Sequence, residues 1–570
     1  SPTGARAAFE ARGEILTVPA EKGDARNLTQ TPGAMERSPA WSPDGRLVAY
    51  FSDAGGEYAL HLKPQNGKGE TTVITLAEKP GFYFNTTWSP DSRKVAYTDA
   101  HHGLWFVDVE TKQPVKVDHN PFWTRDGGLF QPSWSPDSRY LAYARQLKNH
   151  MGAIFAFDTQ EKKSHQLTDG MSDVRCPAFD RDGKHLYFAA STNSGASLQP
   201  DVHSAGGRSS FSLYVAVLSA TDPSPFAPES DEEKGEAKGD DKKGDDKKSE
   251  GKGKPDAKPE GKPDDKAEGK PSAKQDAKAK PDAKPIVKLD LEGFAQRVLP
   301  LPLPPGNYNG LVTGKPGILF AQEIPPAAPT SLGAPGMPGF NVRRHDLKAR
   351  KSDLPYTGIQ AFELSANGEK VLTRQGGSWS IAAVKPLATG SGPMPPPPPA
   401  PGGGLKVEGL DVKVDPKAEW AQMFREAVRI QREFFYDAKH HGLDLNWLEK
   451  HYGAWLPAVA SRQDLNYLMS EALGEVTVSH LGVGGGNLPQ ARSVGIGLLG
   501  ADFELHQGRY RFGKVFNGES WNPGLRAPLT QPGVNVKPGE YLLAVDGRNL
   551  SADTSVYAAF ENTVGKQVVL

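Results

Sequence analysis

The chain has 570 residues, of which 37% are hydrophobic, and it contains 62 Gly, 49 Pro and one Cys. Because this length exceeds what one hydrophobic core can serve, we expect about three or four domains. The formal net charge of −1 excludes binding to nucleic acid or to a membrane surface through bulk charge. The single Cys176 excludes an internal disulfide and a cysteine-based zinc site. No apolar run is long enough for a transmembrane helix.

A ten-residue motif repeats along the first part of the chain. The copies WSPDGRLVAY, WSPDSRKVAY and WSPDSRYLAY begin at Trp41, Trp88 and Trp134, and a degenerate copy, FDRDGKHLYF, begins at Phe179. Pro followed by Asp-Gly or Asp-Ser favours a tight turn, and the apolar run after it is typical of a buried strand. About four short strands in each period of about 45 residues indicate one blade of a β-propeller.

Three weaker copies raise the count to seven blades, over residues 1–389. They are SPTGARAAFE at Ser1, GKPGILFAQE at Gly314–Glu323 and LSANGEKVLT at Leu364–Thr373. A β-sandwich or two smaller sheets is the alternative, and the nearly constant period argues against it. Because the first copy opens without the strand that should precede it, we expect a piece of a longer protein. The lack of a visible signal peptide therefore carries little weight.

Two segments of biased composition interrupt this pattern. Residues 229–284 contain Lys, Asp, Glu, Gly, Pro, Ala, Ser and one Gln, but no large apolar residue. We therefore expect a disordered insertion over 229–288 that extends from one blade. A lysine-rich tail that binds a partner is the alternative, but acidic residues balance the lysines throughout. The second segment, 390–404 (GSGPMPPPPPAPGGG), predicts a spacer that ends the propeller.

Helical periodicity follows the spacer. Asp415-Pro416 is a favourable helix start, and Trp420, Phe424 and Val428 then recur at helical spacing. A second helix is predicted to begin with a capping box, Ser461 and Asp464, and to end at Gly474. The next residues, EVTVSH at 475–480, are predicted to form a short strand. We therefore expect a small α/β segment over 405–490.

The last part of the chain, residues 491–570, predicts short strands and turns. GIGLLG at 495–500 matches a dinucleotide-binding glycine string, but no helix follows it to receive a pyrophosphate, so we reject that function. In ADFELHQGRYRFGKV, the alternation of side chains is typical of strands, and the Gln-Gly pair predicts a turn between two of them. In GVNVKPGEYLLAVDGRNL, a Lys-Pro-Gly turn leads into a strand and then into an Asp-Gly turn.

VKPGEYLLAVDG resembles the PDZ domain of bacterial-type proteases. The order of seven blades, Pro/Gly spacer, helical segment ending in Ser-His, and PDZ domain resembles the tricorn protease family, large serine peptidases related to the tail-specific proteases. The resemblance implies a mainly β, multidomain protein. Its parts are a propeller (1–389), a linker (390–404), the first segment of a protease core (405–490) and a PDZ domain (491–570).

The resemblance also implies a site. His480 would be the general base, and the hydroxyl of Ser479 would help to orient it. On residues alone, a single histidine at a strand end is more often structural. In the family, the nucleophilic serine and a glutamate follow the PDZ domain, and this chain contains no GxSxG motif. We therefore expect the chain by itself to be inactive.

The remaining candidates are weaker. We interpret the pairs His101-His102 and His440-His441 as surface residues, and we expect no metal and no cofactor. Gly495 and Gly497 are candidates to present amides to a peptide carboxylate.

Two functions stay open: a tricorn-like oligopeptidase, and a non-enzymatic propeller–PDZ scaffold that binds extended peptides. Either has peptide partners, no nucleic acid and no membrane insertion. By resemblance, the full-length protein would be a homo-oligomer in the cytoplasm; a periplasmic or secreted location is the alternative.

Overall fold

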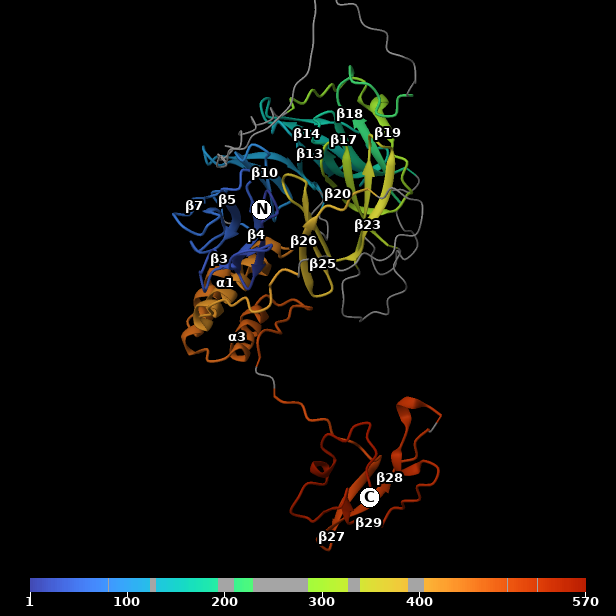
Figure 1. Cartoon of the computed structure of the whole chain (residues 1–570). Coiled ribbons are helices and arrows are strands. Elements are labelled where there is room, and N and C mark those ends of the chain that lie inside the picture. The colour runs from blue at the N-terminus through green and yellow to red at the C-terminus, as the bar shows by residue number, and fades with distance from the viewer. Residues whose placement is uncertain are drawn as a thin grey trace, which may run out of the picture. The chain divides into compact units, whose positions relative to one another are not determined.

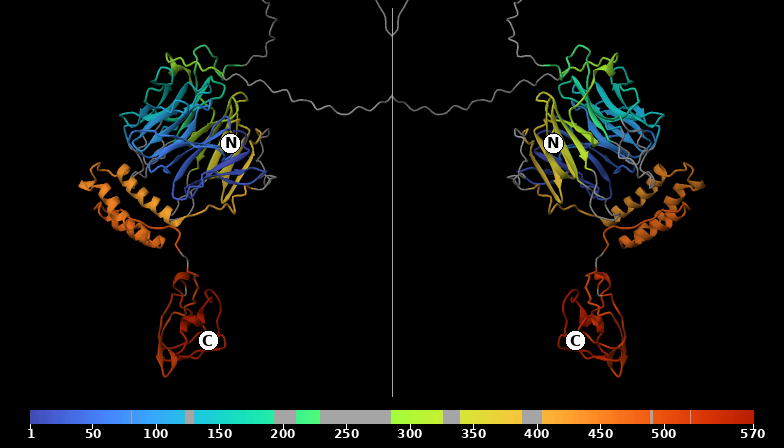
Figure 2. Two further views of the ribbon diagram at one scale, coloured as in Figure 1. Left: turned by 90° about the vertical axis from the view of Figure 1, so that its left-hand side faces the viewer. Right: turned by 90° about the vertical axis from the view of Figure 1, so that its right-hand side faces the viewer.

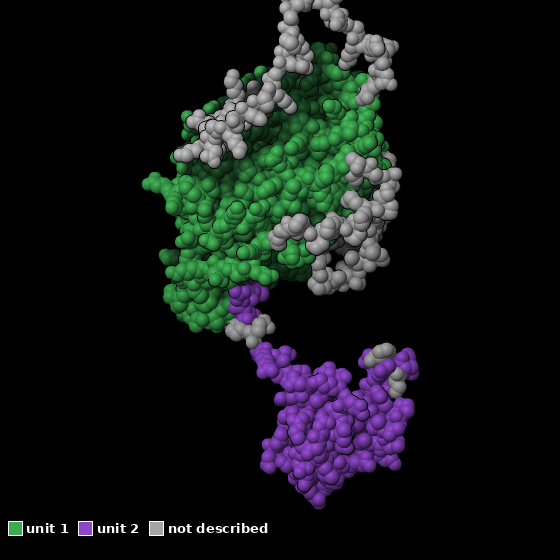
Figure 3. All heavy atoms as spheres, viewed as in Figure 1, with its two compact units in different colours: residues 1–482 green, residues 483–570 purple. Residues whose placement is uncertain are grey.

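The computed structural model describes residues 1–79, 81–122, 130–192, 210–228, 285–325, 339–387, 404–488, 491–519 and 521–570. The chain divides into two compact units, Ser1–Gly482 and Val483–Leu570, which are coloured separately in Figure 3. Residues 229–284 of the predicted insertion and 390–403 of the Pro/Gly spacer lie outside the described residues. The prediction that the disordered insertion extends to 288 is wrong: residues 285–288 are described, and Val287 is buried in the core and donates its amide to Asp137 at 2.9 Å. The other predicted domain boundaries stay predictions.

Seven antiparallel sheets follow one another along the described part of the first unit. The first three are formed by β1 (Arg6–Ala11), β2 (Glu14–Pro19) and β3 (Arg26–Asn27); by β4 (Glu36–Trp41), β5 (Leu47–Ser52), β6 (Ala59–Pro64) and β7 (Thr72–Ile74); and by β8 (Tyr83–Trp88), β9 (Lys94–Asp99), β10 (Gly103–Asp108) and β11 (Pro114–His119). The next two are formed by β12 (Ser133–Trp134), β13 (Tyr140–Gln146), β14 (Gly152–Asp158) and β15 (Lys163–Gln166); and by β16 (Asp173–Phe179), β17 (His185–Ser191), β18 (Ser212–Val217) and β19 (Val298–Pro300), with the 3-10 helix η1 (Phe294–Arg297) before β19. The last two are formed by β20 (Asn307–Thr313), β21 (Ile318–Ile324), β22 (Phe340–Asp346) and β23 (Lys351–Ile359); and by β24 (Ala361–Leu364), β25 (Lys370–Gln375) and β26 (Ser378–Ala383).

These sheets are grouped around a common centre, and the predicted seven-bladed propeller is confirmed (Figures 1 and 2). The repeated motif explains the turn between the first two strands of a blade. In the second sheet, the Ser42 hydroxyl donates to Asp44 at 2.6 Å and accepts the amide of Leu47 at 2.9 Å. The local side-chain bonds therefore hold the turn before the apolar strand enters the core.

The tryptophan of the motif links neighbouring blades. The indole of Trp88 donates to the carbonyl of Ala40 in the preceding sheet at 3.0 Å, and that of Trp134 donates to Thr87 at 3.2 Å. Each amphipathic indole thus packs between two sheets and satisfies its N–H on the neighbour. Apolar side chains between successive sheets complete the core.

Three α-helices follow the propeller: α1 (Pro416–Phe434), α2 (Leu445–Gly453) and α3 (Arg462–Gly474), with the short 3-10 helices η2 (His440–Gly442) and η3 (Leu456–Ala458). The predicted starts are confirmed, because Asp415 caps α1 and Ser461 forms a capping box with Asp464. The helix α2, which Asp444 caps, was not predicted from the sequence. The described residues include no helix long and apolar enough to cross a membrane.

The second unit is small and consists of short strands and turns. β27 (Ala501–His506), β28 (Arg509–Val515) and β29 (Tyr541–Leu542) form one sheet, and β30 (Ala544–Val545) pairs with β31 (Arg548–Asn549). The predicted Gln507-Gly508 turn joins β27 to β28. The 3-10 helices η4 (Pro523–Leu525), η5 (Pro528–Thr530) and η6 (Val556–Phe560) complete the unit, whose core includes Phe512, Leu542 and Phe560.

Candidate functional site

Ser479 and His480 lie just after α3, but the predicted strand over 475–480 is wrong. The chain turns there: Val476 donates to Leu473 and Thr477 to Gly474, both at 3.1 Å, and Thr477 has φ +52. The alternating side chains favoured a strand, but a strand also needs a neighbour for its backbone groups. The described residues pair no strand with this segment.

The Ser479 and His480 side chains are exposed. Neither forms a hydrogen bond or an ion pair with another described residue. The backbone of His480 is left-handed, with φ +64, a conformation that non-glycine residues adopt rarely. The described residues therefore leave the imidazole free of protein partners.

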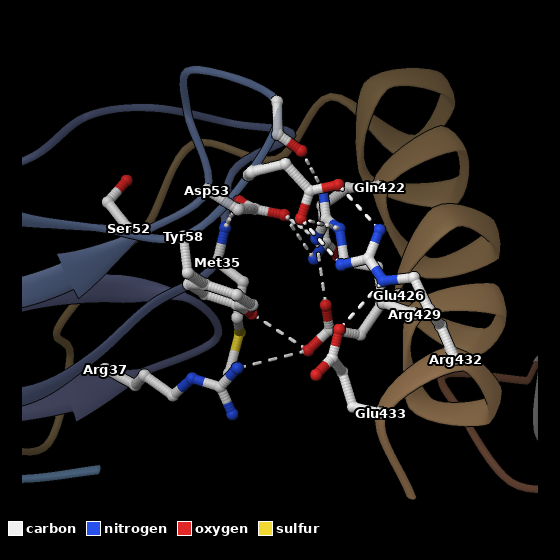
Figure 4. A network of polar contacts seen from close by, with 12 residues as sticks. Met35, Arg37, Ser52, Asp53, Tyr58, Gln422, Glu426, Arg429, Arg432 and Glu433 are labelled. Atoms are coloured by element: carbon white, nitrogen blue, oxygen red, sulfur yellow. Dashed lines mark hydrogen bonds and ion pairs between the residues drawn. The ribbon is translucent and has the colours of Figure 1, made fainter. Parts of the chain in front are cut away.

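The segment that carries His480 is anchored on the propeller through α1 (Figure 4). Arg429 donates to Asp53, in the loop between β5 and β6, at 2.6 Å; only 5% and 1% of these two side chains are exposed. Gln422 donates to the same carboxylate at 3.1 Å, and the amide of Met35 donates to its other oxygen at 2.7 Å. Burial opposes the charge of Arg429, but the hydrogen bonds and charges of Asp53 and its acidic neighbours outweigh it, so the pKa of Arg429 is raised.

A second group of side chains extends this contact. The guanidinium of Arg37 lies 4.2 Å from the ring centroid of Tyr58 and 3.4 Å from Glu426 of α1. The Tyr58 hydroxyl donates to Glu426 at 2.8 Å, and burial raises the pKa of Tyr58. Because charges and aromatic faces meet away from water, α1 is held in one orientation on the first unit.

The propeller encloses a central cavity of about 640 Å³. Its wall includes Asn85, Gln131 and Cys176, which have positive φ and recur at the period of the motif. Asn85 and Cys176 sit at register shifts of their inner strands. The Gln131 amide accepts from the amide of Cys176 and donates to the carbonyl of Asn309, both at 3.0 Å. Bulges thus direct polar side chains toward the centre of the ring.

One group has the composition of a metal site. Atoms of Asp180, Asp182 and His185 lie within 4.8 Å of one another. All three have protein partners: His185 contacts Asp182 at 2.6 Å, and Asp180 accepts from Tyr187 at 2.7 Å and from the amide of Gly317. These bonds explain the group as a hydrogen-bond network at the turn between β16 and β17, which was not predicted from the sequence.

The histidine pairs do not form a further cluster of metal ligands in the described residues. His101 and His441 are exposed, and His102 and His440 are half-buried. His101 faces Glu433 at 3.3 Å. Burial and neighbouring histidines lower the pKa of His102, with Asp99 opposing them.

Gly495 and Gly497 of the second unit are hydrogen-bonded to the segment around Phe560 and Asn562. The amide of Gly497 donates to the carbonyl of Phe560 at 3.0 Å, and the carbonyl of Gly495 accepts from the amide of Asn562 at 2.6 Å. A side chain at Gly497 would come within 2.3 Å of Thr563. The Gly497 amide is therefore not available to a peptide carboxylate, and the glycine permits close packing instead. For the Gly495 amide the expectation stays a prediction.

A ring of β-sheets, a docked helical segment and a separate small β unit define a multidomain protein built around a propeller. The chain belongs to the tricorn protease family. The tricorn protease second beta propeller domain matches residues 1–385, the C1 domain matches residues 416–474 and the PDZ domain matches residues 497–570. The resemblance inferred from the sequence is confirmed.

The chain is 28% identical over 573 residues to tricorn protease homolog 1 of Streptomyces coelicolor, covering 99% of this chain and 49% of the relative. It is 27% identical to the putative tricorn-like protease C-terminal subunit of Sulfurisphaera tokodaii, over 50% of this chain and 32% of that protein. The crystal structure of the tricorn protease shares the fold, with a TM-score of 0.69 at 18% identity over 99% of this chain and 49% of that one. The chain thus spans about half, or less, of the length of these proteins.

Proposed function

We propose that the chain is part of a serine peptidase that degrades oligopeptides, with His480 as the general base and the Ser479 hydroxyl as the group that orients it. The observation that supports this most directly is the position of His480. It is an exposed histidine just after α3, at the end of a helical segment that a buried ion pair anchors on the propeller. Family membership supports the reaction class.

In this proposal the nucleophilic hydroxyl comes from a segment outside this sequence. An imidazole nitrogen of His480 accepts the proton of that hydroxyl as its oxygen bonds to the substrate carbonyl carbon. The same proton then passes to the leaving amine as the peptide C–N bond breaks, and a water molecule repeats the sequence on the acyl-enzyme. The chain by itself is inactive, because it lacks the nucleophile.

The propeller would act beside this site as a channel or filter for peptides, and full-length chains would associate as a homo-oligomer. The central cavity of about 640 Å³ supports the first role, because the described residues line it with apolar, aromatic, amide and hydroxyl groups and with one charged side chain, Arg181. Such a wall favours neutral, extended peptide segments over highly charged ligands.

The test is the peptidase activity of a longer chain that includes the segment proposed to supply the nucleophilic serine. We expect His480→Ala to lower kcat/KM by about 10⁴-fold or more, and Ser479→Ala to lower it less. His451→Ala is the matched control, because His451 is also exposed on the helical segment. Unchanged activity of the His480→Ala chain would reject the proposed base.

The second candidate is a scaffold that binds extended peptides without cleaving them. It is supported by β27, an edge strand that pairs only with β28 among the described residues. A free edge can accept a peptide strand. Peptide binding that persists in His480→Ala, together with an inactive longer chain, would favour the scaffold.

A further inference from the structure

The propeller ring is closed without a shared strand in the part of the chain that the structure describes. The first sheet contains only β1–β3 and the seventh only β24–β26, so no sheet combines strands from both ends of the propeller. Among the described residues, blades one and seven therefore meet through side chains and isolated backbone contacts. We call this junction the seam.

Direct contacts across the seam are few. The amide of Asn367 donates to the carbonyl of Pro2 at 3.0 Å. The rings of Phe9 on β1 and Trp379 on β26 lie 5.0 Å apart, edge to face. To the hydrophobic cluster at this junction the first sheet contributes two buried residues, Ala7 and Val18. By comparison, the junction between the sixth and seventh sheets buries a larger set: Phe320, Val342, Tyr356, Ile359, Phe362 and Val371.

Residues 404–410, which begin at the last residue of the spacer, fill the seam. Leu405 is 7% exposed and packs in one cluster with Ala7 and Val18 of the first sheet and Trp379 of the seventh. Its amide donates to the carbonyl of Trp379 at 2.7 Å. Val407 and Leu410 pack against the same cluster. A segment from outside the propeller thus supplies the largest buried aliphatic side chain of this junction.

The same segment continues directly into α1, which is fixed on the first two sheets. Asp415 caps α1, and Glu419 in its first turn pairs with Arg12 between β1 and β2 at 2.7 Å. Arg429 further along α1 is paired with Asp53. Residues 411–415 connect this segment to α1, so a displaced α1 moves the point to which residues 404–410 are tethered.

We infer that residues 404–410 form a strap that closes the propeller ring in place of a shared strand, and that undocking of α1 releases the strap and opens the seam. A cavity of about 450 Å³ lies along the seam, lined by Ala7 and Ala8 of β1 and by Leu372 and Ile381 of the seventh sheet. Opening the seam widens this cavity, which already opens to solvent, toward the side of the ring. The strap acts whether or not the protein is a peptidase.

Native-state amide hydrogen exchange of the 570-residue chain tests the inference. We expect Leu405→Ala to accelerate exchange in β1, β2, β25 and β26 by about tenfold or more, while β9, β13 and β17 stay within about twofold of the parent. Lys406→Ala is the matched control, since Lys406 is the exposed neighbour. Leu405→Met, which conserves volume, is expected to keep the parent rates. Should the alanine variant not fold, Leu405→Val replaces it.

Two results would overturn the inference. The strap is rejected if Leu405→Ala leaves the seam strands at parent rates or accelerates all sheets equally. The coupling is rejected if Arg429→Met frees α1, seen as faster exchange along that helix, and yet leaves the seam strands unchanged. Faster exchange in both α1 and the seam strands of the Arg429→Met variant supports the coupling.

Discussion

The guanidinium of Arg429 and the carboxylate of Asp53 meet at 2.6 Å, although 376 residues separate them in the chain. Both side chains are buried, and Gln422 and the Met35 amide satisfy the remaining acceptor positions of Asp53. A buried pair of this kind specifies one orientation of α1, because any other orientation leaves a charge unpaired away from water.

We therefore expect Arg429→Met to lower the free energy of α1 opening by about 3–5 kcal/mol, since it leaves Asp53 buried without its partner. Hydrogen exchange of the α1 amides measures this directly. Arg12→Ala is the control: it removes an ion pair to the same helix, but Arg12 is partly exposed, so a loss of at most about 1 kcal/mol is expected. Equal effects of the two variants would show that burial does not decide the contribution.

A separate prediction concerns the double variant that combines Asp53→Asn with Arg429→Met. Removing the charge of Asp53 eliminates the unpaired ion that the single variant creates, while the asparagine carbonyl can still accept from Met35. We expect the double variant to regain at least about 1 kcal/mol of the α1 opening free energy lost by Arg429→Met. A double variant that opens as easily as Arg429→Met would contradict this account.

Glu36 makes the stability of the first unit depend on pH. Its side chain is 1% exposed, and burial raises its pKa to about 7, with Glu14 adding to the shift and the hydroxyls of Thr31 and Ser52 opposing it. One carboxyl oxygen has no described partner. The folded chain therefore keeps a proton on Glu36 that the unfolded chain releases near the ordinary glutamate pKa of 4.5.

Between these two pKa values the folded state binds the extra proton, so stability falls as pH rises, and the loss is complete above about pH 7. The expected loss is on the order of 3 kcal/mol. Glu36→Gln removes the titration, so its unfolding free energy should change less than that of the parent between about pH 5 and about pH 8. Parallel pH profiles of the two proteins would contradict the assignment.

Gly497 is required for packing in the PDZ unit. A side chain at this position would come within 2.3 Å of the Thr563 hydroxyl oxygen and 3.4 Å of the Thr563 backbone. We expect Gly497→Ala to destabilise this unit by about 1–3 kcal/mol, measured by its denaturant unfolding. Gly524→Ala is the control in the same unit, because its nearest neighbour lies 3.7 Å away. A larger loss in the Gly524 variant would exclude steric packing as the reason.

Cys176 should be unreactive in the folded chain. It is 2% exposed, and burial raises the pKa of its thiol to about 11. Because the thiolate is the reactive form, an aromatic disulfide reagent at about pH 8 should label it slowly before unfolding and fully after denaturation. Rapid labelling of the native chain would show that the wall of the central cavity opens at Cys176.

The sequence by itself determined the propeller, the two capped helix starts and the family. A blade is a local unit, so its turn and its buried strand leave a motif that recurs at nearly constant intervals, beginning at Trp41, Trp88 and Trp134. Capping residues such as Asp415 and Ser461 also act within one turn of helix, and their signal is therefore readable without tertiary information.

Only the tertiary structure decided the features that depend on distant partners. The alternation in residues 475–480 predicted a strand, but the described residues supply no neighbour, and the chain turns instead. The Gly497 amide, a candidate to bind a peptide carboxylate, donates instead to the Phe560 carbonyl. The pairs Arg429–Asp53 and Leu405–Trp379 leave no pattern in the sequence. Each depends on the close approach of two segments, which chain position alone does not encode.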